Sequence, residues 1–142
     1  MEMLVRDLMT PEVVTLEADE SLLLADDVMR LARIRHLPVV DRGRLVGLVS
    51  HRDMLRASVS SLAGLSRTEE ASIKGAIPVR EVMKREVRTV RPDDTARAAC
   101  ELILEWKLGC LPVVDGDGRL VGILTEADFV ELARRYLEKS RA

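Results

Sequence analysis

Aromatic residues are almost missing from this chain of 142 residues: Phe, Tyr and Trp together make up 2% of it. A hydrophobic core must therefore be built from aliphatic side chains and methionine, and 47% of hydrophobic residues is enough for one. Cysteine is also scarce. Two cysteines without a C-x-x-C spacing are too few for a disulfide framework or a zinc knuckle, and a reducing cytoplasm is the simplest compartment for them.

Long apolar runs and an excess of one charge are missing as well. No run of about eighteen apolar residues occurs, so we expect no membrane-spanning segment. Residues 1–7 carry two acids and lack the apolar stretch of a signal peptide. Lys and Arg number 22 against 24 Asp and Glu, for a net charge of −2. Because binding to the phosphates of a nucleic acid needs a surplus of Lys and Arg on one face, and this chain has no such surplus overall, we expect no nucleic-acid partner.

What the sequence does contain is an internal repeat. Two blocks return unchanged and in the same order: LPVVD at 37–41 and 111–115, and GRLVG at 43–47 and 118–122. An earlier block, VRDLM at 5–9, returns as VREVM at 79–83. The one difference in spacing falls in a turn, where extra residues are tolerated. The chain is therefore a duplication.

Each copy predicts a β-α-β-β-α unit. In the first we expect a strand over 13–16, a helix capped by Asp19 and running to about residue 34, strands over 37–40 and 45–49 around a tight turn at 41–43, and a helix capped by Ser50. In the second we expect a helix over 95–107, strands over 111–114 and 120–124, and a last helix from 126 towards 139. One such unit is too small to bury both faces of its sheet, so the two copies should pack together.

The domain limits follow from this pattern. We place repeat 1 at 3–57 and repeat 2 at 77–134, with residues 135–142 as a helix end and tail. Residues 58–76 read as a linker with a helical extension, and we expect no folded site there because its middle is small and polar.

Three motifs occur in both copies: V-x-[DE]-x-M, h-P-V-V-D and G-h-h-[ST]-x-x-D, where h is apolar. Together they resemble the cystathionine-beta-synthase (CBS) domain repeat over almost the whole chain except the linker and the last dozen or so residues. The resemblance implies an α/β (α+β) fold in which two β-α-β-β-α repeats pack about a pseudo-twofold axis, a Bateman module. It also implies clefts between the repeats for adenosine-containing ligands such as AMP, ADP, ATP or S-adenosylmethionine.

The sharpest candidates for ligand binding are Ser50 with Asp53 and Thr125 with Asp128. A hydroxyl residue followed three positions later by an acid is also a helix capping box, which explains either pair without a ligand. However, the cap prefers Glu or Gln, and each motif directly follows an apolar strand. A carboxylate there can accept both hydrogen bonds of a ribose diol, and the helix N-terminus favours anions. The resemblance makes Asp53 and Asp128 the ribose acceptors.

Basic side chains gather near the first motif. The resemblance places Arg35 and His36 where family members often carry a basic pair that touches phosphates, and His51 and Arg52 add to it. The alternative is a solvated, charged helix end. Residues 109–110 and 126–127 of the second repeat carry no cations at the matching places, so we predict that the two sites differ.

Four apolar positions complete the candidate set: Pro38, Pro112, Val13 and Val87. Each proline reads as a strand start, where no ladder donor is needed, and in the family the backbone around it lines the adenine pocket. Val13 and Val87 read as core strand residues, and the resemblance implies that this strand also contacts the base.

An enzyme is not expected. His36 and His51 lack metal-ligand spacing, there is no Gly-rich phosphate loop, and no base or nucleophile joins the candidate residues. We expect a regulatory module that needs no cofactor, binds AMP, ADP or ATP, and modulates itself or a protein partner. The alternatives are a structural dimerisation or adaptor module with empty clefts, or an S-adenosylmethionine sensor. Apolar helix faces such as 22–24 and 132–133 predict a homodimer.

Overall fold

The computed structural model describes residues 2–62 and 64–140, and within them all side chains but those of residues 58–62. The chain separates into two compact units that are not its two halves. The central unit is Val14–Val87, and the split unit combines Met1–Val13 with Arg88–Ala142. Of the helices in the described part, none combines the length and apolar character needed to cross a membrane.

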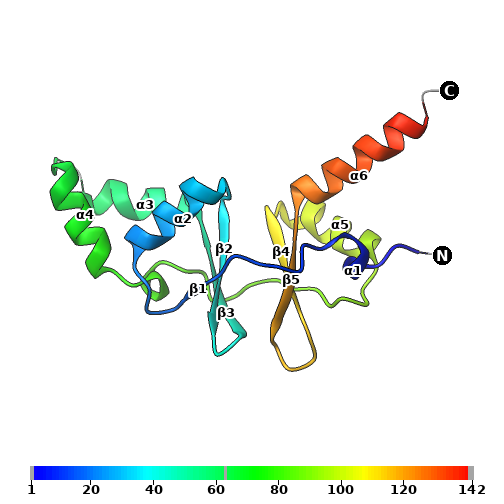
Figure 1. The fold of residues 1–142 in the computed structure, drawn as a ribbon, viewed down its shortest axis with the longest axis horizontal. Coiled ribbons are helices and arrows are strands. Elements are labelled where there is room, and N and C mark those ends of the chain that lie inside the picture. The colour runs from blue at the N-terminus through cyan, green and yellow to red at the C-terminus, as the bar shows by residue number, and fades with distance from the viewer. Residues whose placement is uncertain (1, 63, 141–142) are drawn as a thin grey trace. The chain divides into compact units, whose positions relative to one another are not determined.

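The central unit contains a three-stranded sheet and its helices (Figure 1). Its elements are β1 (Leu16–Glu17), α2 (Leu22–Ala32), β2 (His36–Asp41), β3 (Arg44–Ser50), α3 (His51–Leu62), α4 (Arg67–Ala76) and the 3-10 turn η1 (Val79–Glu81). Strand β2 lies in the middle, parallel to β1 and antiparallel to β3. The β-α-β-β-α order and the mixed α/β class predicted from the sequence are confirmed.

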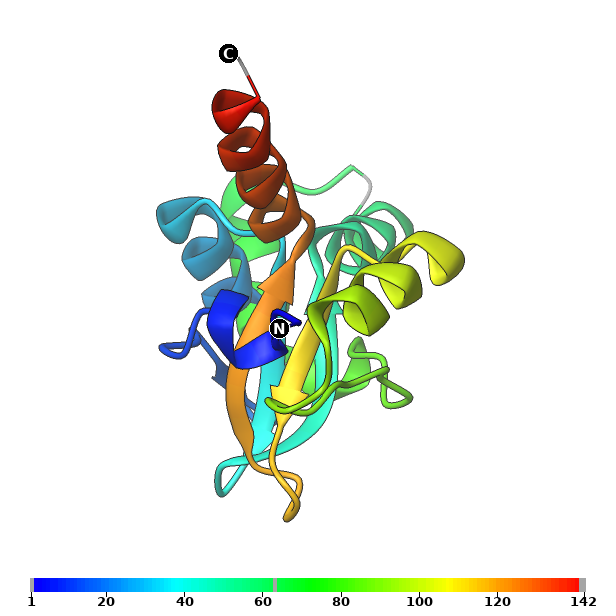
Figure 2. The ribbon, with the colours of Figure 1, turned by 90° about the vertical axis from the view of Figure 1, so that its right-hand side faces the viewer.

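The split unit repeats this plan with a shorter first strand. Its elements are α1 (Val5–Leu8), α5 (Ala96–Trp106), β4 (Cys110–Val114), β5 (Leu120–Thr125) and α6 (Glu126–Lys139). Strands β4 and β5 form an antiparallel hairpin, and the expected first strand is reduced to one parallel bridge between Val90 and Val113. Figure 2 shows α6 continuing directly from the end of β5.

Turn chemistry fixes the central hairpin. Asp41 pairs with Arg44, so Arg42 and Gly43 form a two-residue turn, and both have positive φ (53° and 82°). Such a turn matches the twist of the two strands it joins. Both hairpins also carry a register shift in their first strand, between Val39 and Val40 and between Val113 and Val114.

The central core is aliphatic. Its buried side chains are Leu16, Leu22, Ala25, Met29, Leu37, Val39, Val49, Met54, Val79 and Met83. Two of them, Val79 and Met83, come from the beginning of the second repeat. The Val79 N–H donates to the Glu20 carbonyl (2.7 Å), and Lys84 and Leu48 exchange two backbone hydrogen bonds of 2.9 Å.

The split core receives the matching segment of the first repeat. Its buried side chains are Val5, Val90, Ala99, Ile103, Leu111, Val113 and Leu124. The Val5 N–H donates to the Asp94 carbonyl (2.8 Å), and Thr10 and Ile123 exchange two backbone hydrogen bonds of 3.0 Å. We call residues 4–10 and 78–84 the opening arms. Each arm packs on the hairpin of the other repeat, so the repeat limits of 3–57 and 77–134 do not coincide with the packing units.

The predicted cap of the first long helix is wrong. The N-cap of α2 is Ser21, whose Oγ accepts the Leu24 N–H (3.2 Å), whereas Asp19 lies in the turn before it. The opening arm and the residue before it hold this start in place, because the Leu22 N–H donates to the Ile77 carbonyl and the Glu20 carbonyl accepts the Val79 N–H. Because Ser and Asp are about equally good N-caps, local preference does not decide between Ser21 and Asp19, and these tertiary hydrogen bonds favour the start at Ser21.

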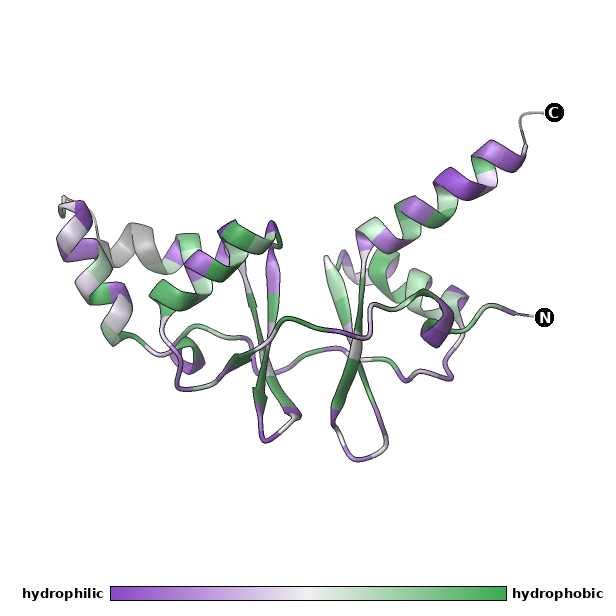
Figure 3. Cartoon of the chain, in the orientation of Figure 1, coloured by the Kyte–Doolittle hydropathy of each residue, from purple (hydrophilic) through white to green (hydrophobic). Residues whose placement is uncertain are grey.

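The linker also holds more structure than we predicted. Helix α3 runs on to Leu62, residue 63 lies outside the described residues, and α4 then begins with Ser66 as N-cap. The predicted tail likewise ends outside them, at residues 141–142. Figure 3 shows that both apolar and polar residues occur along α4. It packs on α2, where Lys74 pairs with Asp26 at 3.6 Å and a Cβ on Gly75 would lie 3.8 Å from Leu23.

Candidate functional site

Ser50 and Asp53 lie where β3 passes into α3, as the sequence predicts. The Asp53 N–H donates to Ser50 Oγ (3.1 Å), and the Ser50 N–H donates to Asp53 Oδ2 (3.2 Å). This is a complete capping box, so the capping interpretation of the motif is correct. It leaves Oδ1 of the carboxylate outside the box. The Asp53 side chain is only 10% exposed, which makes this a sheltered acceptor at a helix N-terminus.

Lys84 is the residue at this junction that the sequence reasoning missed. Its Nζ lies 3.9 Å from Asp53 Oδ1. Lys84 belongs to the opening arm of the second repeat, and its backbone is held to Leu48 on β3. The internal alignment could have drawn attention to it, because Lys84 follows Met83 where Thr10 follows Met9, a cation in place of a hydroxyl.

The predicted basic group adjoins the same junction. The His51 N–H donates to the Arg35 carbonyl (2.8 Å), and His36 pairs with Ser50 across β2 and β3. The side chains of Arg35, His51 and Arg52 are exposed, and that of His36 is half-buried. The first repeat thus gathers its predicted cations next to the Ser50–Asp53 box.

Thr125 and Asp128 form the corresponding junction of the split unit, where β5 passes into α6. The Thr125 N–H donates to Asp128 Oδ2 (2.8 Å). The Glu126 N–H donates to the Gly109 carbonyl (3.2 Å), which repeats the backbone bond between His51 and Arg35. The two junctions therefore have the same backbone hydrogen bond, but Gly109 has no side chain and leaves the position equivalent to Arg35 without a positive charge.

Cys110 takes the place of His36 in the split unit. It is the first residue of β4 and pairs with Thr125. Burial raises the pKa of its thiol to about 12, so the group is a neutral, apolar contributor to the core at ordinary pH. The second junction is thus without positive charge at both positions where the first carries Arg35 and His36.

The two prolines lie inside strands and not at their starts. Pro38 pairs with Leu48 and Pro112 with Ile123, and both rings are fully buried. The Pro112 carbonyl accepts the Val90 N–H (3.1 Å). Since the nitrogen and carbonyl of a strand residue face the same side, the proline nitrogen faces away from the β5 ladder, which needs no donor from it. A ligand contact here would involve the backbone, as the resemblance implies.

Val13 and Val87 are not the core strand residues we expected. Both lie outside regular strands and are only half-buried. Strand pairing in the central unit begins later, at Leu16 with Val39, so residues 13–15 have no ladder partner. Contact of Val13 and Val87 with a base stays a prediction.

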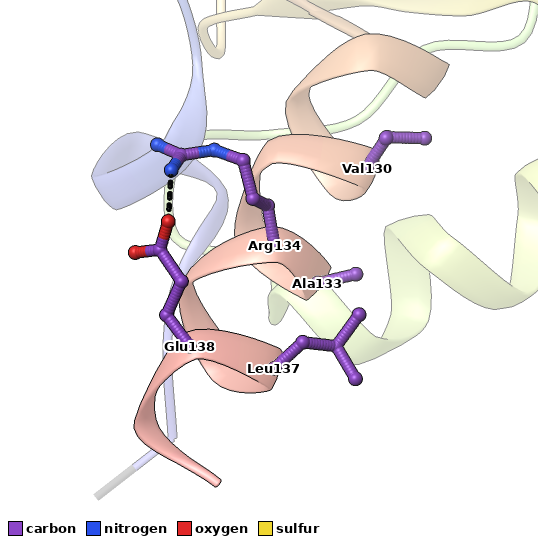
Figure 4. A pocket seen from close by; sticks show the side chains of 5 residues that line it. All are labelled: Val130, Ala133, Arg134, Leu137 and Glu138. Carbon is purple, nitrogen blue, oxygen red and sulfur yellow. Dashed lines mark hydrogen bonds and ion pairs between the residues drawn. The ribbon is translucent and has the colours of Figure 1, made fainter. Parts of the chain in front are cut away.

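A hollow on the surface lies elsewhere, on α6. It is lined by Val130, Ala133, Arg134, Leu137 and Glu138. Figure 4 shows the three apolar side chains on one side of the helix and the Arg134–Glu138 ion pair, 2.5 Å long, on the other. None of these residues belongs to either junction. Within residues 2–62 and 64–140, no group of three or more His, Cys, Asp or Glu side chains could hold a metal ion.

Fold and sites together define a duplicated α/β module with one partly buried carboxylate at each strand-to-helix junction. The family model of the CBS domain matches the chain twice, at residues 5–60 and 79–135. The chain therefore belongs to the CBS domain family.

Three solved structures resemble it over nearly their whole length. One is a Vibrio cholerae protein assigned to acetoin utilization, AcuB, with 36% identity, TM-score 0.81 and coverage of 97% of this chain and 95% of that one. The CBSX2 protein in complex with AMP is 31% identical, with TM-score 0.79 and coverage of 94% and 98%. The CBS domain pair of protein MJ0100, in complex with 5′-methylthioadenosine and S-adenosyl-L-methionine, is 25% identical, with TM-score 0.79 and coverage of 96% and 99%.

Some relatives are much longer. The chain spans 45% of an uncharacterized protein from Methanocaldococcus jannaschii, MJ1225, with 32% identity over 127 residues. It spans 22% of inosine-5′-monophosphate dehydrogenase from Mycobacterium tuberculosis, with 38% identity over 131 residues.

Proposed function

We propose that this protein is a regulatory module that binds an adenine nucleotide of the AMP, ADP or ATP type, with Asp53 and Asp128 as ribose acceptors. The observation that carries the proposal is the sheltered carboxylate of Asp53. One of its oxygens accepts the Ser50 N–H, and the other lies outside the capping box, beside Lys84. A carboxylate oxygen can accept two hydrogen bonds, so the capping box and a ribose diol can share this group.

The similar structures support adenosine as the shared part of the ligand. AMP is bound in one of them, and 5′-methylthioadenosine and S-adenosyl-L-methionine in another. All three molecules contain an adenosine, whereas only AMP carries a phosphate. The basic side chains beside the first junction, Arg35 and Arg52 with His51 between them in the sequence, favour the nucleotide, because guanidinium groups bind phosphate in two-pronged, charge-assisted contacts. An S-adenosylmethionine sensor is the second candidate.

We assign no catalytic step to the module. Each carboxylate contacts its own capping hydroxyl and a backbone N–H group, and Asp53 also lies beside Lys84. None of these forms the paired nucleophile and base that acyl or phosphoryl transfer needs. Binding energy then serves to alter the module itself or a protein partner.

A thermal-shift screen tests the proposal. A ligand that binds only the folded state raises its apparent stability, by about 2.7 kcal/mol at a hundred times its Kd. AMP, ADP, ATP and S-adenosylmethionine should be compared with GMP, which carries the same phosphate on another base. We expect at least one adenine nucleotide to raise Tm more than GMP does. Equal shifts for all, or none, would refute the proposal and favour a structural module with empty sites.

We also propose that the module forms a homodimer through its helices. On α6, Val130 and Leu137 are 67% and 63% exposed and share a face with Ala133; on α2, Leu24 is exposed, whereas Leu22 belongs to the core. Exposed apolar faces commonly mark interfaces. Sedimentation should show a dimer at micromolar concentration, and a monomer both with and without AMP would contradict this proposal.

A further inference from the structure

The two carboxylate junctions differ in a residue that comes from the opposite repeat. Lys84 and Thr10 occupy equivalent places at the ends of the two opening arms. Lys84 exchanges backbone hydrogen bonds with Leu48, and Thr10 does so with Ile123. These bonds hold each arm at the same point of its hairpin. In the central unit this brings Lys84 Nζ to 3.9 Å from Asp53 Oδ1, and we expect Thr10 to take the matching place beside the Thr125–Asp128 box.

The backbone of Lys84 is further fixed by its neighbour. Met83 is 8% exposed and packs where a Cβ on Gly47 would otherwise lie. The Lys84 carbonyl is 3.0 Å from that same position. The core thus fixes the backbone of Lys84. Its side chain is 67% exposed, and its Nζ lies 3.9 Å from Asp53 Oδ1. The ammonium group can reach Asp53 and can also turn towards a ligand bound there.

We infer that Lys84 is a specificity-determining residue, which makes the Asp53 site select nucleotides over uncharged nucleosides. The inference rests on the proposed function. A nucleoside whose ribose donates to Asp53 Oδ1 competes with Lys84 for that oxygen, and it gives the lysine no other anion to pair with. A nucleotide offers its phosphate as that partner, so the ammonium exchanges one anion for another. The Asp128 site has a hydroxyl, Thr10, in this place and lacks the selection.

The inference differs from simple charge compensation of Asp53. If Lys84 were only a counter-ion of Asp53, its removal would change the affinities for AMP and adenosine alike, because both ligands would place the same ribose on that carboxylate. If Lys84 instead contacts the phosphate, its removal weakens the binding of AMP and leaves the binding of adenosine unchanged. The ratio of the two affinities separates the two roles, and a contribution from Lys84 should shrink as salt rises.

The experiment is a reciprocal exchange, followed by calorimetry with AMP and adenosine. Lys84→Thr is made in an Asp128→Glu background, which leaves the Asp53 site to be measured, and Thr10→Lys in an Asp53→Glu background. We expect Lys84→Thr to lower the preference for AMP over adenosine by about three- to tenfold, and Thr10→Lys to raise it at the other site. Lys74→Thr is the matched control, because it removes the same charge from a lysine that pairs with Asp26.

Two results would overturn the inference in different ways. If the wild type binds AMP and adenosine but Lys84→Thr or Thr10→Lys leaves their ratio unchanged, Lys84 does not select the ligand and the proposed function stands. If the wild type binds neither ligand, the proposed function is wrong and this inference falls with it.

Discussion

Met83 packs into the space that Gly47 leaves open. A Cβ on Gly47 would collide with the Met83 sulfur, and its nearest backbone neighbour would be the Lys84 carbonyl at 3.0 Å. The other repeat has the same pair: a Cβ on Gly122 would lie 2.6 Å from Met9 Sδ and 3.2 Å from the Thr10 carbonyl. The methionine and glycine that recur in both repeats are thus partners between repeats, and they join each opening arm to its hairpin.

Substitution of Gly47 by Ala should therefore destabilise the fold, by about 1–3 kcal/mol, because the added methyl group overpacks a filled space. The cost should fall in a Met83→Ala background, where that space is empty, and urea unfolding of the double-mutant cycle measures this coupling. Gly75→Ala is the control, since its Cβ has an ordinary contact of 3.8 Å in a helix and should be neutral or stabilising. Equal costs in both backgrounds would show that Met83 does not fill the space.

Asp115 should make the β4–β5 hairpin sensitive to acid. The N–H groups of Arg119 (3.0 Å) and Asp117 (2.9 Å) donate to its carboxylate and hold the pKa of Asp115 below its usual value. A lowered pKa in the folded state contributes stability above about pH 4, and this is lost as pH falls through the folded pKa. Asp115→Ala should lower Tm at about pH 7 and have less effect at about pH 3. An equal loss at both pH values would contradict this account.

Cys110 should be protected from alkylation while the protein is folded. The thiolate is the reactive form, and burial raises the pKa of Cys110 to about 12. Cys100, which is only half-buried, should react first with iodoacetamide at about pH 8, and Cys110 only after unfolding in urea. Mass spectrometry of the labelled peptides distinguishes the two. Native labelling of Cys110 at the rate of Cys100 would mean that β4 opens readily.

Phosphate recognition should depend on the first repeat. Arg35 and His36 adjoin the Ser50–Asp53 box, and Gly109 and Cys110 hold the equivalent places in the second repeat. Replacing Arg35 and His36 by Ala should weaken the binding of AMP about tenfold and leave the binding of adenosine unchanged. Arg30→Ala, which removes a cation from an exposed pair with Asp27, is the control for net charge. Equal losses for AMP and adenosine would show that these residues shape the pocket and do not read the phosphate.

Much of the fold could be predicted because local signals and the repeat agree. The last helix was expected from residue 126 towards 139, and α6 is Glu126–Lys139. The predicted strands of both hairpins are correct to within one residue, since apolar runs and turn residues bound them closely. Helix α4 was missed although its signal was present: Ser66 is a preferred N-cap residue with Glu three positions later, and its Oγ accepts the Glu69 N–H (3.2 Å) and donates to Glu69 Oε1 (2.9 Å).

The packing of each opening arm on the hairpin of the other repeat, which is an exchange of arms between repeats, could not be predicted from local pattern. The motif at residues 79–83 indicates a buried segment, but it does not indicate which hairpin covers that segment, because this depends on contacts between residues distant in sequence. The same exchange hid Lys84, which lies 31 positions from Asp53 in the sequence and 3.9 Å away in the structure. The same arm bonds next to the α2 cap at Ser21, where the Val79 N–H donates to the Glu20 carbonyl.

The most direct test of ribose binding by Asp53 and Asp128 separates their two roles. Replacing both by Glu keeps an acid that capping boxes prefer, but moves each carboxylate by one methylene group. We expect Tm to stay within about two degrees of the wild type, whereas calorimetry should show AMP affinity reduced about ten- to a hundredfold, from the loss of charge-assisted hydrogen bonds. If the double variant binds AMP as tightly as the wild type, the carboxylates only cap helices and the account is wrong.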